Sequence, residues 1–477
     1  MTGGRWVFAY KRDANGTVTR YKARFVAQGY TQRAGIDYTD VWAPCPARAT
    51  VRAVLAKVAA HDLEMHVVDI KNAYLNAPMD VPVYVWQPEG YDVGGDGIVA
   101  LLRYALYGCK QAGRLWGKHA HGTLTGLGAV RSQADPTLYI WMQAAGPTVI
   151  LVHVDDMSIA SSSLADVQHA KEAILSTYGG RDLGAATTFL GYKIFRDRAA
   201  GTLTLSCPGL TTALLDEFSM TDAKPTKVPV PVGTSLMRTG TDLLPDGGRY
   251  AEMVVSLLYL STSTRPDISF AAGLLARFMT QPEEGHWHLA KHVLRYLVGT
   301  ATFGLRYGTQ DGLAGAVDAD HGGCLITRRS TTGWVFTLHG AAISWGSKRQ
   351  PTVSSSTAES EYIAAAAVTR EALWLRKLMA DLGEPTDVVH VAEDNQACLA
   401  LIANPESTGR AKHIDMAHHL VRERVAMGEV DFHYTPGREL VADGLTKPLP
   451  GPTFTDFRKR LGMVGPVTAG TVRPSAE

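Results

Sequence analysis

The sequence predicts a mixed α/β protein with more than one domain, and three observations support this fold class. Short apolar stretches that end in turns alternate with helical stretches over the first 200 residues. Residues 200–247 are rich in Pro, Gly and Thr, which indicates a linker or boundary. From residue 312 the pattern reads β-β-β-α-β-α, which predicts a separate α/β domain.

The N-terminal elements follow from the spacing of apolar residues. Two strand-like stretches, 6–10 and 17–26, flank the turn signal Asp13-Ala-Asn-Gly16, so we expect a β-hairpin with basic side chains on its second strand. Further along, we expect a helix and three strands over 51–61, 65–70, 148–154 and 157–160.

The second half of the chain is predicted in the same way. Residues 250–300 have the apolar spacing of two or three amphipathic helices, with Pro266-Asp267 at a helix start. The α/β domain is expected to contain three strands, a long helix and a fourth strand before its last helices, over 313–317, 334–338, 342–345, 358–382 and 388–392. The Gly/Pro-rich residues 449–477 are expected to form a flexible tail.

Composition sets wide limits on function. A chain of 477 residues that is 45% hydrophobic and 19% charged can form several domains with apolar cores. No apolar run is long enough to span a membrane, and the first residues lack a secretory signal, so we expect a chain that stays inside the cell and binds no membrane. The five cysteines have no CxxC spacing, which favours reduced structural thiols.

Charge is informative only near the N-terminus. The net charge of +1 neither supports nor excludes binding to nucleic acid. Residues 1–52 contain nine Lys and Arg against three Asp. This excess could neutralise phosphates, or it could be an ordinary solvated face.

Two adjacent aspartates follow an apolar strand in the sequence His153-Val-Asp155-Asp156. Joining a nucleotide to a 3′-hydroxyl uses two divalent cations, and Mg²⁺ prefers the hard oxygen ligands that carboxylates supply. A third aspartate, Asp69, ends the apolar strand 66–68, and Tyr74 follows five residues later. Such a pair taken alone is more often a solvated turn, so order and context decide.

Six stretches in order resemble the reverse transcriptase motifs of copia-type retrotransposons. They are Arg20-Tyr-Lys-Ala-Arg-Phe-Val-Ala-Gln-Gly-Tyr-Thr-Gln32, Val68-Asp-Ile-Lys-Asn-Ala-Tyr-Leu-Asn76, Gln87-Pro-Glu-Gly90, Leu106-Tyr-Gly-Cys-Lys-Gln-Ala-Gly-Arg114, Val154-Asp-Asp156 and Phe189-Leu-Gly191. The resemblance implies a right-hand polymerase with fingers, palm and thumb. It implies that Asp69, Asp155 and Asp156 are catalytic and bind the metals.

The same resemblance implies a nucleotide-binding set. Lys22 and Arg24 would face the incoming triphosphate, Tyr74 would select deoxyribose by blocking a 2′-hydroxyl, and Gln111 would line the site. The competing interpretations are a core aromatic for Tyr74, a helix-surface residue for Gln111 and solvated charges for the two cations. His153 and Gly113 depart from the family's usual Tyr and Pro, and neither removes a metal ligand.

Four further acids are candidates for a nuclease site, because cleavage of RNA in a hybrid also favours two metals held by carboxylates. They are Asp318, Glu361, Asp394 and Asp443. Their surroundings resemble the copia-type ribonuclease H domain: Val317-Asp-Ala-Asp320, Ser354-Ser-Ser-Thr-Ala-Glu-Ser-Glu-Tyr-Ile-Ala364, Glu393-Asp-Asn-Gln396, Lys412-His-Ile-Asp415 and Val441-Ala-Asp-Gly-Leu-Thr-Lys447. The resemblance implies that all four are catalytic metal ligands.

Some nearby residues are weaker candidates. Asp320 and Glu359 are runners-up to Asp318 and Glu361, and we expect them to be capping or surface acids. His321-Gly-Gly323 replaces the family's usual Trp-Ala-Gly, which affects local packing. Two histidine groups coincide with helices of the family pattern and lack a further ligand, so we do not expect zinc there; they are His286, His288 and His292, and His413, His418 and His419.

The resemblance covers roughly residues 5–448 and sets the expected organisation. We expect an N-terminally truncated reverse transcriptase over 1–235, a helical connection over 236–311, a ribonuclease H-like domain over 312–448 and the tail over 449–477. Each active site would use two Mg²⁺ ions, with Mn²⁺ as a substitute. Expected partners are an RNA template, a DNA or RNA primer, RNA–DNA hybrid, dNTPs and other parts of the element polyprotein, in the cytoplasm or in virus-like particles.

Two alternatives remain open at this point. A decayed element copy would fold and bind hybrid without catalysis, which the expected truncation favours and the intact metal ligands disfavour. An integrase shares the ribonuclease H fold but usually has a His/Cys zinc module, which the sequence lacks.

Overall fold

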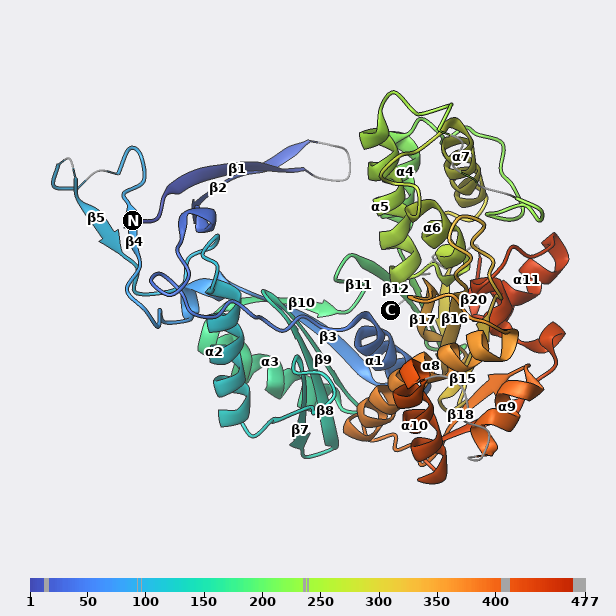
Figure 1. Cartoon of the computed structure of the whole chain (residues 1–477). Coiled ribbons are helices and arrows are strands. Elements are labelled where there is room, and N and C mark those ends of the chain that lie inside the picture. The colour runs from blue at the N-terminus through green and yellow to red at the C-terminus, as the bar shows by residue number, and fades with distance from the viewer. Residues whose placement is uncertain are drawn as a thin grey trace, which may run out of the picture. The chain divides into compact units, whose positions relative to one another are not determined.

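The computed structural model describes residues 1–12, 17–91, 93–95, 97–234, 237, 240–404 and 412–465 (Figure 1). The chain forms two compact units. The first contains Met1–Pro46 and Glu64–Ala186, and the second contains Ala47–Leu63 and Thr187–Glu477. In the described residues no helix is long and apolar enough to cross a membrane. The mixed α/β fold class is confirmed.

The first unit is built on an antiparallel sheet that has six strands in its described part, in the order β10-β3-β9-β8-β7-β6. The strands are β3 (Glu64–Ile70), β6 (Val130–Arg131), β7 (Leu138–Gln143), β8 (Gly146–His153), β9 (Asp156–Ser161) and β10 (Gly180–Ala185). Its other elements are β4 (Tyr84–Trp86), β5 (Val99–Leu101), α2 (Ala112–Gly126), α3 (Leu164–Tyr178), η1 (Gly29–Thr31) and η2 (Ala73–Asn76).

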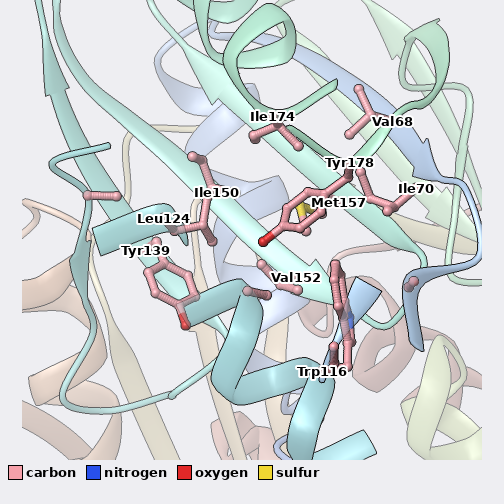
Figure 2. Packing of buried hydrophobic residues seen from close by; sticks show 14 of the residues in the cluster. Val68, Ile70, Trp116, Leu124, Tyr139, Ile150, Val152, Met157, Ile174 and Tyr178 are labelled. Atoms are coloured by element: carbon pink, nitrogen blue, oxygen red, sulfur yellow. The ribbon is translucent and has the colours of Figure 1, made fainter. Parts of the chain in front are cut away.

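Helices α2 and α3 pack against this sheet through one apolar cluster (Figure 2). Trp116 of α2, Ile174 and Tyr178 of α3, and Ile150 and Met157 of the sheet all belong to it. Burying a large apolar side chain stabilises a fold by roughly 1.5–3 kcal/mol. The cluster therefore fixes strands β8 and β9, and with them the turn between these strands.

The N-terminal hairpin pairs β1 (Gly4–Arg12) with β2 (Val18–Ala27), as predicted, although its turn, residues 13–16, lies outside the described residues. Successive strand residues point to opposite faces. Tyr10 lies opposite Tyr21 on one face, and Val7 lies opposite Arg24 on the other. The hairpin thus has an aromatic face and a basic face, and the basic face carries Lys22 and Arg24.

The second unit contains two sheets. The first runs in the order β11-β12-β13-β14-β20, and its strands are β11 (Thr188–Phe189), β12 (Tyr192–Asp197), β13 (Thr202–Ser206), β14 (Gly304–Tyr307) and β20 (Met463–Val464). The second runs in the order β17-β16-β15-β18-β19, and its strands are β15 (Ala314–Ala319), β16 (Thr331–Leu338), β17 (Ala341–Arg349), β18 (Val389–Glu393) and β19 (Val430–Tyr434). Strands β17, β16 and β15 are antiparallel, whereas β18 and β19 run parallel to β15.

The helices of this unit are α1 (Arg48–Ala60), α4 (Pro208–Glu217), α5 (Gly247–Ser263), α6 (Ser269–Ala276), α7 (Glu284–Val298), α8 (Thr357–Asp381), α9 (Gln396–Ala403), α10 (Lys412–Ala426) and α11 (Gly451–Arg460), with short 3-10 turns η3 (Pro266–Ile268), η4 (Gly437–Glu439) and η5 (Val441–Leu445). The helices expected over 51–61, 250–300 and 358–382 are confirmed. Strand β19 was not expected.

The boundaries of the expected domains need correction. The β11-β12-β13-β14-β20 sheet joins strands from before residue 235 and after residue 448, so cuts at 235, 311 and 448 do not separate compact units. The expected linker over 200–247 begins with β13 and α4. The expectation of a flexible tail from 449 is wrong for 449–465, because Phe454, Phe457 and Leu461 are buried there.

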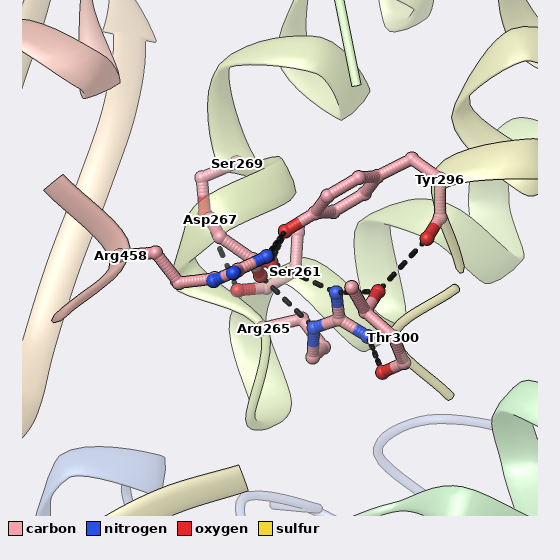
Figure 3. A network of polar contacts seen from close by, with 7 residues as sticks. All are labelled: Ser261, Arg265, Asp267, Ser269, Tyr296, Thr300 and Arg458. Carbon is pink, nitrogen blue, oxygen red and sulfur yellow. Dashed lines mark hydrogen bonds and ion pairs between the residues drawn. The ribbon is translucent and has the colours of Figure 1, made fainter. Parts of the chain in front are cut away.

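A buried ion pair links helices of the second unit (Figure 3). Arg265 and Asp267 are almost fully buried, and their side chains meet at 2.8 Å. The phenol of Tyr296 on α7 donates to Asp267, and the Arg265 guanidinium donates to the carbonyl of Thr300 at 2.9 Å. Arg458 of α11 reaches the Tyr296 oxygen at 3.3 Å. Arg458 thus connects the segment after residue 448 to this network.

Glu384 joins α1 to the β17-β16-β15-β18-β19 sheet. Its carboxylate lies 3.1 Å from Lys57 Nζ, 3.0 Å from His61 Nε2 and 2.9 Å from His339 Nε2. Burial alone would raise the pKa of Glu384, but the hydrogen bond from His339 and the Lys57 ammonium outweigh it and lower this pKa to about 2. The ionised carboxylate therefore stabilises the attachment of α1.

Replacing Glu384 with Gln should lower the free energy of unfolding at neutral pH by roughly 1.5–3 kcal/mol, the range for hydrogen bonds to charged groups. The folded-state pKa, about 2, lies below the ordinary value of 4.5, so this stabilisation is present above the ordinary value and is lost as the pH falls toward the lower one. Urea unfolding should show the gap between wild type and variant shrinking as the pH falls below the ordinary value.

The exposed acid Asp387 offers a matched control for this measurement. Asp387→Asn should leave the free energy of unfolding within about 0.5 kcal/mol of wild type, as is usual for surface substitutions. A Glu384→Gln difference that stays constant or grows on acidification would contradict the assigned role.

Candidate active sites

The turn between β8 and β9 carries two adjacent aspartates. His153 pairs with Asp156 across the hairpin, so Val154 and Asp155 are the turn residues. Val154 has a φ of 49°, in the left-handed region that β-branched residues rarely adopt. Its carbonyl accepts a 2.9 Å hydrogen bond from the indole of Trp116. The core of the unit thus holds a strained turn in place.

The third aspartate comes from the neighbouring strand. Asp69 lies opposite Asp156 in the pairing of β3 with β9. The amide of Ile70 donates to the carbonyl of Asp155 at 2.6 Å, which ties the end of β3 to the turn. The structure therefore brings together all three acids that the sequence predicts for the polymerase site.

These carboxylates lie in a partly buried and electronegative environment. Burial raises the pKa of Asp155 and of Asp156, and the charge of Asp69 raises both further. The phenol of Tyr107 opposes the shift at Asp155, because it donates to both carboxylate oxygens at 3.0 and 3.2 Å. The three carboxylates are thus close enough to affect one another's titration, and carboxylates are the hard oxygen ligands that Mg²⁺ prefers.

Arg181 also lies at this site, and sequence reasoning missed it. It faces Asp69 in the pairing of β10 with β3, and its Nη2 is 2.7 Å from Asp69 Oδ2. The Arg181 side chain is 64% exposed, so the pair contributes at most about 1 kcal/mol to stability. The Gly-Gly pair before Arg181 indicates that a strand starts there. That Arg181 lies opposite Asp69 follows only from the register in which β10 pairs with β3.

Three of the four predicted nucleotide-binding residues lie near the same carboxylates. The charges of Arg24 and Lys22 lower the pKa of Asp155, against the larger effect of burial. The Arg24 guanidinium lies 5.4 Å from the centre of the Tyr107 ring. The Tyr74 ring centre is 4.6 Å from that of Tyr107, and Tyr74 also packs on the apolar cluster. Tyr74 thus packs as a core aromatic and also lies beside the ring that contacts Asp155.

Gln111 has a different position from the one expected. Its side chain is buried, its amide nitrogen donates to the carbonyl of Asp37 at 2.9 Å, and its amide oxygen accepts from Gln32 at 3.1 Å. The prediction that Gln111 lines the nucleotide site is therefore corrected, because no part of it is exposed to a ligand. Gln111 instead anchors the segment after β2 to the start of α2.

Replacing Gln111 with Leu should lower the free energy of unfolding by roughly 1–3 kcal/mol, because it leaves the Asp37 carbonyl and the Gln32 amide without this buried partner. Urea unfolding followed by circular dichroism measures the change. Lys118→Ala, at an exposed position of α2, is the control and should stay within about 0.5 kcal/mol of wild type. An unchanged Gln111→Leu protein would contradict the anchoring role.

The second unit gathers a separate set of acids. Asp318 is on β15, Glu361 is on α8, Asp394 follows β18 and Asp443 is in η5. Carboxylate oxygens of Asp318, Asp394 and Asp443 lie within 4.8 Å of one another. Those of Glu361, Asp394 and a fifth acid, Glu393, form a second such group. All four predicted nuclease acids therefore meet, with Asp394 in both groups.

Glu393 is the residue that sequence reasoning missed at this site. It is fully buried at the end of β18, directly before Asp394. Consecutive strand residues normally face opposite sides of a sheet, so strand alternation predicts that only one of Glu393 and Asp394 lies at the site. The Glu393-Asp394 pair at a strand end, similar to Asp155-Asp156 after β8, was the available signal.

Burial and mutual repulsion make this cluster strongly electronegative. Burial is the main cause that raises the pKa of Asp318, Glu361 and Glu393, and neighbouring carboxylates raise all three further. Among the described side chains, Oε2 of Glu361 and Oε2 of Glu393 are buried and have no hydrogen-bond partner. Buried oxygens of this kind fit a divalent cation, which would supply the missing partner.

Two residues from the segment after η5 contact the cluster. The Thr446 hydroxyl donates to Asp318, and Lys447 Nζ lies 2.8 Å from Asp443 Oδ1. The runner-up acids have other partners: Asp320 accepts from the amide of Thr331, and Glu359 accepts from the amide of Ser355 at 2.7 Å. The preference for Asp318 and Glu361 over these runners-up agrees with that geometry.

The departures from the family pattern have local effects. The charge of His153 lowers the pKa of Asp156, against the larger effect of burial. A Cβ added at Gly113 would lie 3.0 Å from the Cβ of Ala43, so the glycine allows α2 to pack closely there. A Cβ at Gly322, where the family usually has Ala, would lie 3.4 Å from Nη2 of Arg328. Each position thus constrains packing beside a site.

Two histidines of the first group, His286 and His292, have partners within the protein. His286 Nδ1 accepts from the amide of Glu283 at 2.8 Å, and His292 Nε2 lies 3.1 Å from the carbonyl of Val228. The side chains of His413 and His418 lie outside the described residues. All five cysteines are free, in agreement with the expected reduced thiols.

Known proteins resemble this chain over nearly its whole length. The family profile described as reverse transcriptase (RNA-dependent DNA polymerase) matches residues 1–232. The Pol polyprotein of transposon TNT 1-94 from Nicotiana tabacum is 35% identical over 468 residues, which are 96% of this chain and 35% of that protein. A transposon Ty5-1 protein of Saccharomyces cerevisiae is 34% identical over 307 residues, which are 64% of this chain and 99% of that protein.

The Pol polyprotein of transposon RE2 from Arabidopsis thaliana is 34% identical over 99% of this chain and 33% of that polyprotein. The chain thus spans about a third of the length of these Pol polyproteins. Among solved structures, a foamy viral protease-reverse transcriptase in complex with RNA/DNA hybrid has a similar fold. The TM-score is 0.51 at 11% identity, over 91% of this chain and 50% of that chain.

Proposed function

This chain belongs to the reverse transcriptases of copia-type retrotransposons, and we propose that it copies element RNA into DNA and cleaves the RNA of the resulting hybrid. One observation carries the polymerase assignment: the β8–β9 turn presents Asp155 and Asp156 beside Asp69 of β3. The three acids and the basic face of the hairpin lie in one compact unit.

Asp69, Asp155 and Asp156 would hold two Mg²⁺ ions, or Mn²⁺ in their place. Bound there, the metals would activate the attacking hydroxyl and stabilise charge on the leaving phosphates. Tyr107 orients the Asp155 carboxylate through its two hydrogen bonds. The strained turn at Val154 keeps both turn carboxylates at the end of the hairpin.

Lys22, Arg24 and Tyr74 would bind the dNTP. The two cations share a face of β2 and are close enough to Asp155 to affect its titration, so a triphosphate that approached the aspartates would meet both charges. Tyr74 packs against Tyr107, which gives a rigid aromatic surface for the sugar. An RNA template and a DNA or RNA primer complete the proposed complex.

The ribonuclease H activity is proposed for the acidic cluster of the second unit. Asp318, Glu361, Asp394 and Asp443 would hold two divalent cations, and we add Glu393 because its free buried oxygen faces the same group. An RNA–DNA hybrid is the proposed substrate. The presence of such a hybrid in the foamy viral protein of similar fold supports this choice.

The polymerase is tested by primer extension on an RNA template with Mg²⁺, using the whole chain. Asp155→Asn with Asp156→Asn should reduce incorporation by at least a hundredfold, because both changes remove charge that the metals require. Glu172→Gln, at an exposed position of α3, should extend like wild type. Equally low incorporation by wild type and the double variant would overturn the polymerase proposal and favour a decayed copy that only binds nucleic acid.

The nuclease is tested separately with a labelled RNA–DNA hybrid. Asp394→Asn should abolish RNA cleavage while leaving primer extension within about twofold of wild type, because the two carboxylate clusters belong to different compact units. Asp387→Asn, an exposed acid before β18, is the control and should cleave normally. Loss of both activities in Asp394→Asn would contradict the assignment of separate sites.

A further inference from the structure

A cavity of about 430 Å³ opens beside the acidic cluster of the second unit. Its walls come from the end of α6, the loop between β15 and β16, the last residue of β17 and the residues after η5. None of the acids predicted for the nuclease lines it. Its chemistry is therefore distinct from that of the carboxylate cluster.

Three cationic side chains line this cavity: Arg277, Arg349 and Lys447. Arg277 ends α6 and donates to the hydroxyl of Thr331 at 3.0 Å, which fixes the direction of its guanidinium. Arg349 ends β17 and is exposed. Cations from three separate elements thus meet around one opening.

Lys447 is paired with Asp443, so Arg277 and Arg349 are the two cations left to be compensated by groups on the cavity wall. Asp320 is the acidic residue on its wall, and its carboxylate accepts a hydrogen bond from the amide of Thr331. Burial lowers the pKa of Arg277, and the charge of Arg349 lowers it further. Burial would raise the pKa of Cys324, but hydrogen bonds from Thr327, Ile326 and Arg349 lower it to about 7. The cavity thus favours negative charge.

The cavity adjoins the acidic cluster through two shared residues. Thr446 lines the cavity while its hydroxyl donates to Asp318. Lys447 lines the cavity while its ammonium pairs with Asp443. A ligand in the cavity therefore lies one side chain away from the carboxylates.

We propose that this cavity is a binding subsite for a backbone phosphate of the RNA–DNA hybrid, next to the bond that the acidic cluster cleaves. The proposal rests on the proposed nuclease function. Arginine forks bind phosphate oxygens in pairs, and phosphate contacts set the register of a protein on nucleic acid without reading its sequence. The subsite would hold one strand so that a neighbouring phosphodiester reaches the carboxylates.

Binding of a short RNA–DNA hybrid to the whole chain tests this subsite in EDTA, without metal, by fluorescence anisotropy at several salt concentrations. Arg349→Gln should weaken binding by roughly tenfold and reduce the slope of log Kd against log salt by about one, because one phosphate contact is lost. Lys348→Gln removes the same charge from the adjacent position, which lies on the other face of β17 and does not line the cavity. It should bind within about twofold of wild type.

Equal losses in both variants would show nonspecific attraction and overturn the subsite, as would an unchanged Arg349→Gln protein. Free inorganic phosphate could occupy the same cavity, so its binding is measured as well. If Arg349→Gln abolished tight binding of inorganic phosphate but left binding of the hybrid unchanged, the cavity would be a site for free phosphate and the proposed subsite would be overturned. Failure of the nuclease proposal can be told apart from failure of the subsite, because in that case the wild-type protein would cleave no hybrid. Arg349→Gln should still cleave with a raised KM, whereas Asp394→Asn should not cleave.

Discussion

Crowded carboxylates repel one another and lose hydration when they are buried, which costs free energy. Each compact unit contains such a group of acids. In the first unit three aspartates meet at the ends of β3 and the β8–β9 hairpin. In the second, five acids meet around the end of β18. Neither arrangement is favourable alone, so apolar packing and buried polar networks elsewhere must stabilise the strands that carry them.

The two units compensate this charge differently. The three aspartates of the first unit have the exposed Arg181 and the phenol of Tyr107 as neighbours, so water reaches this group. The acids of the second unit are deeper, and Lys447 and Thr446 approach them from one side. Two buried glutamate oxygens remain without a partner in the described part of this site.

Local sequence patterns predicted the elements that carry both sites, because turn signals and apolar spacing act within a few residues. Asp155, Asp156 and Asp318 follow or end such strands, and the resemblance to copia-type motifs singled them out from other acids at turns. Contacts between distant segments were not predictable. The partner of Arg181 depends on strand register, the burial of Gln111 depends on the segment after β2, and the packing of the chain beyond residue 448 depends on Arg458 and the Arg265 network. Each of these requires tertiary structure.

The placement of α1 has a consequence for how either unit can be produced alone. Residues 47–63 belong to the second unit although residues on both sides of them belong to the first, so the chain passes between the units three times. No single breakpoint yields either unit intact. A fragment for separate expression of either unit would therefore need a chain rejoined across the residues that belong to the other unit.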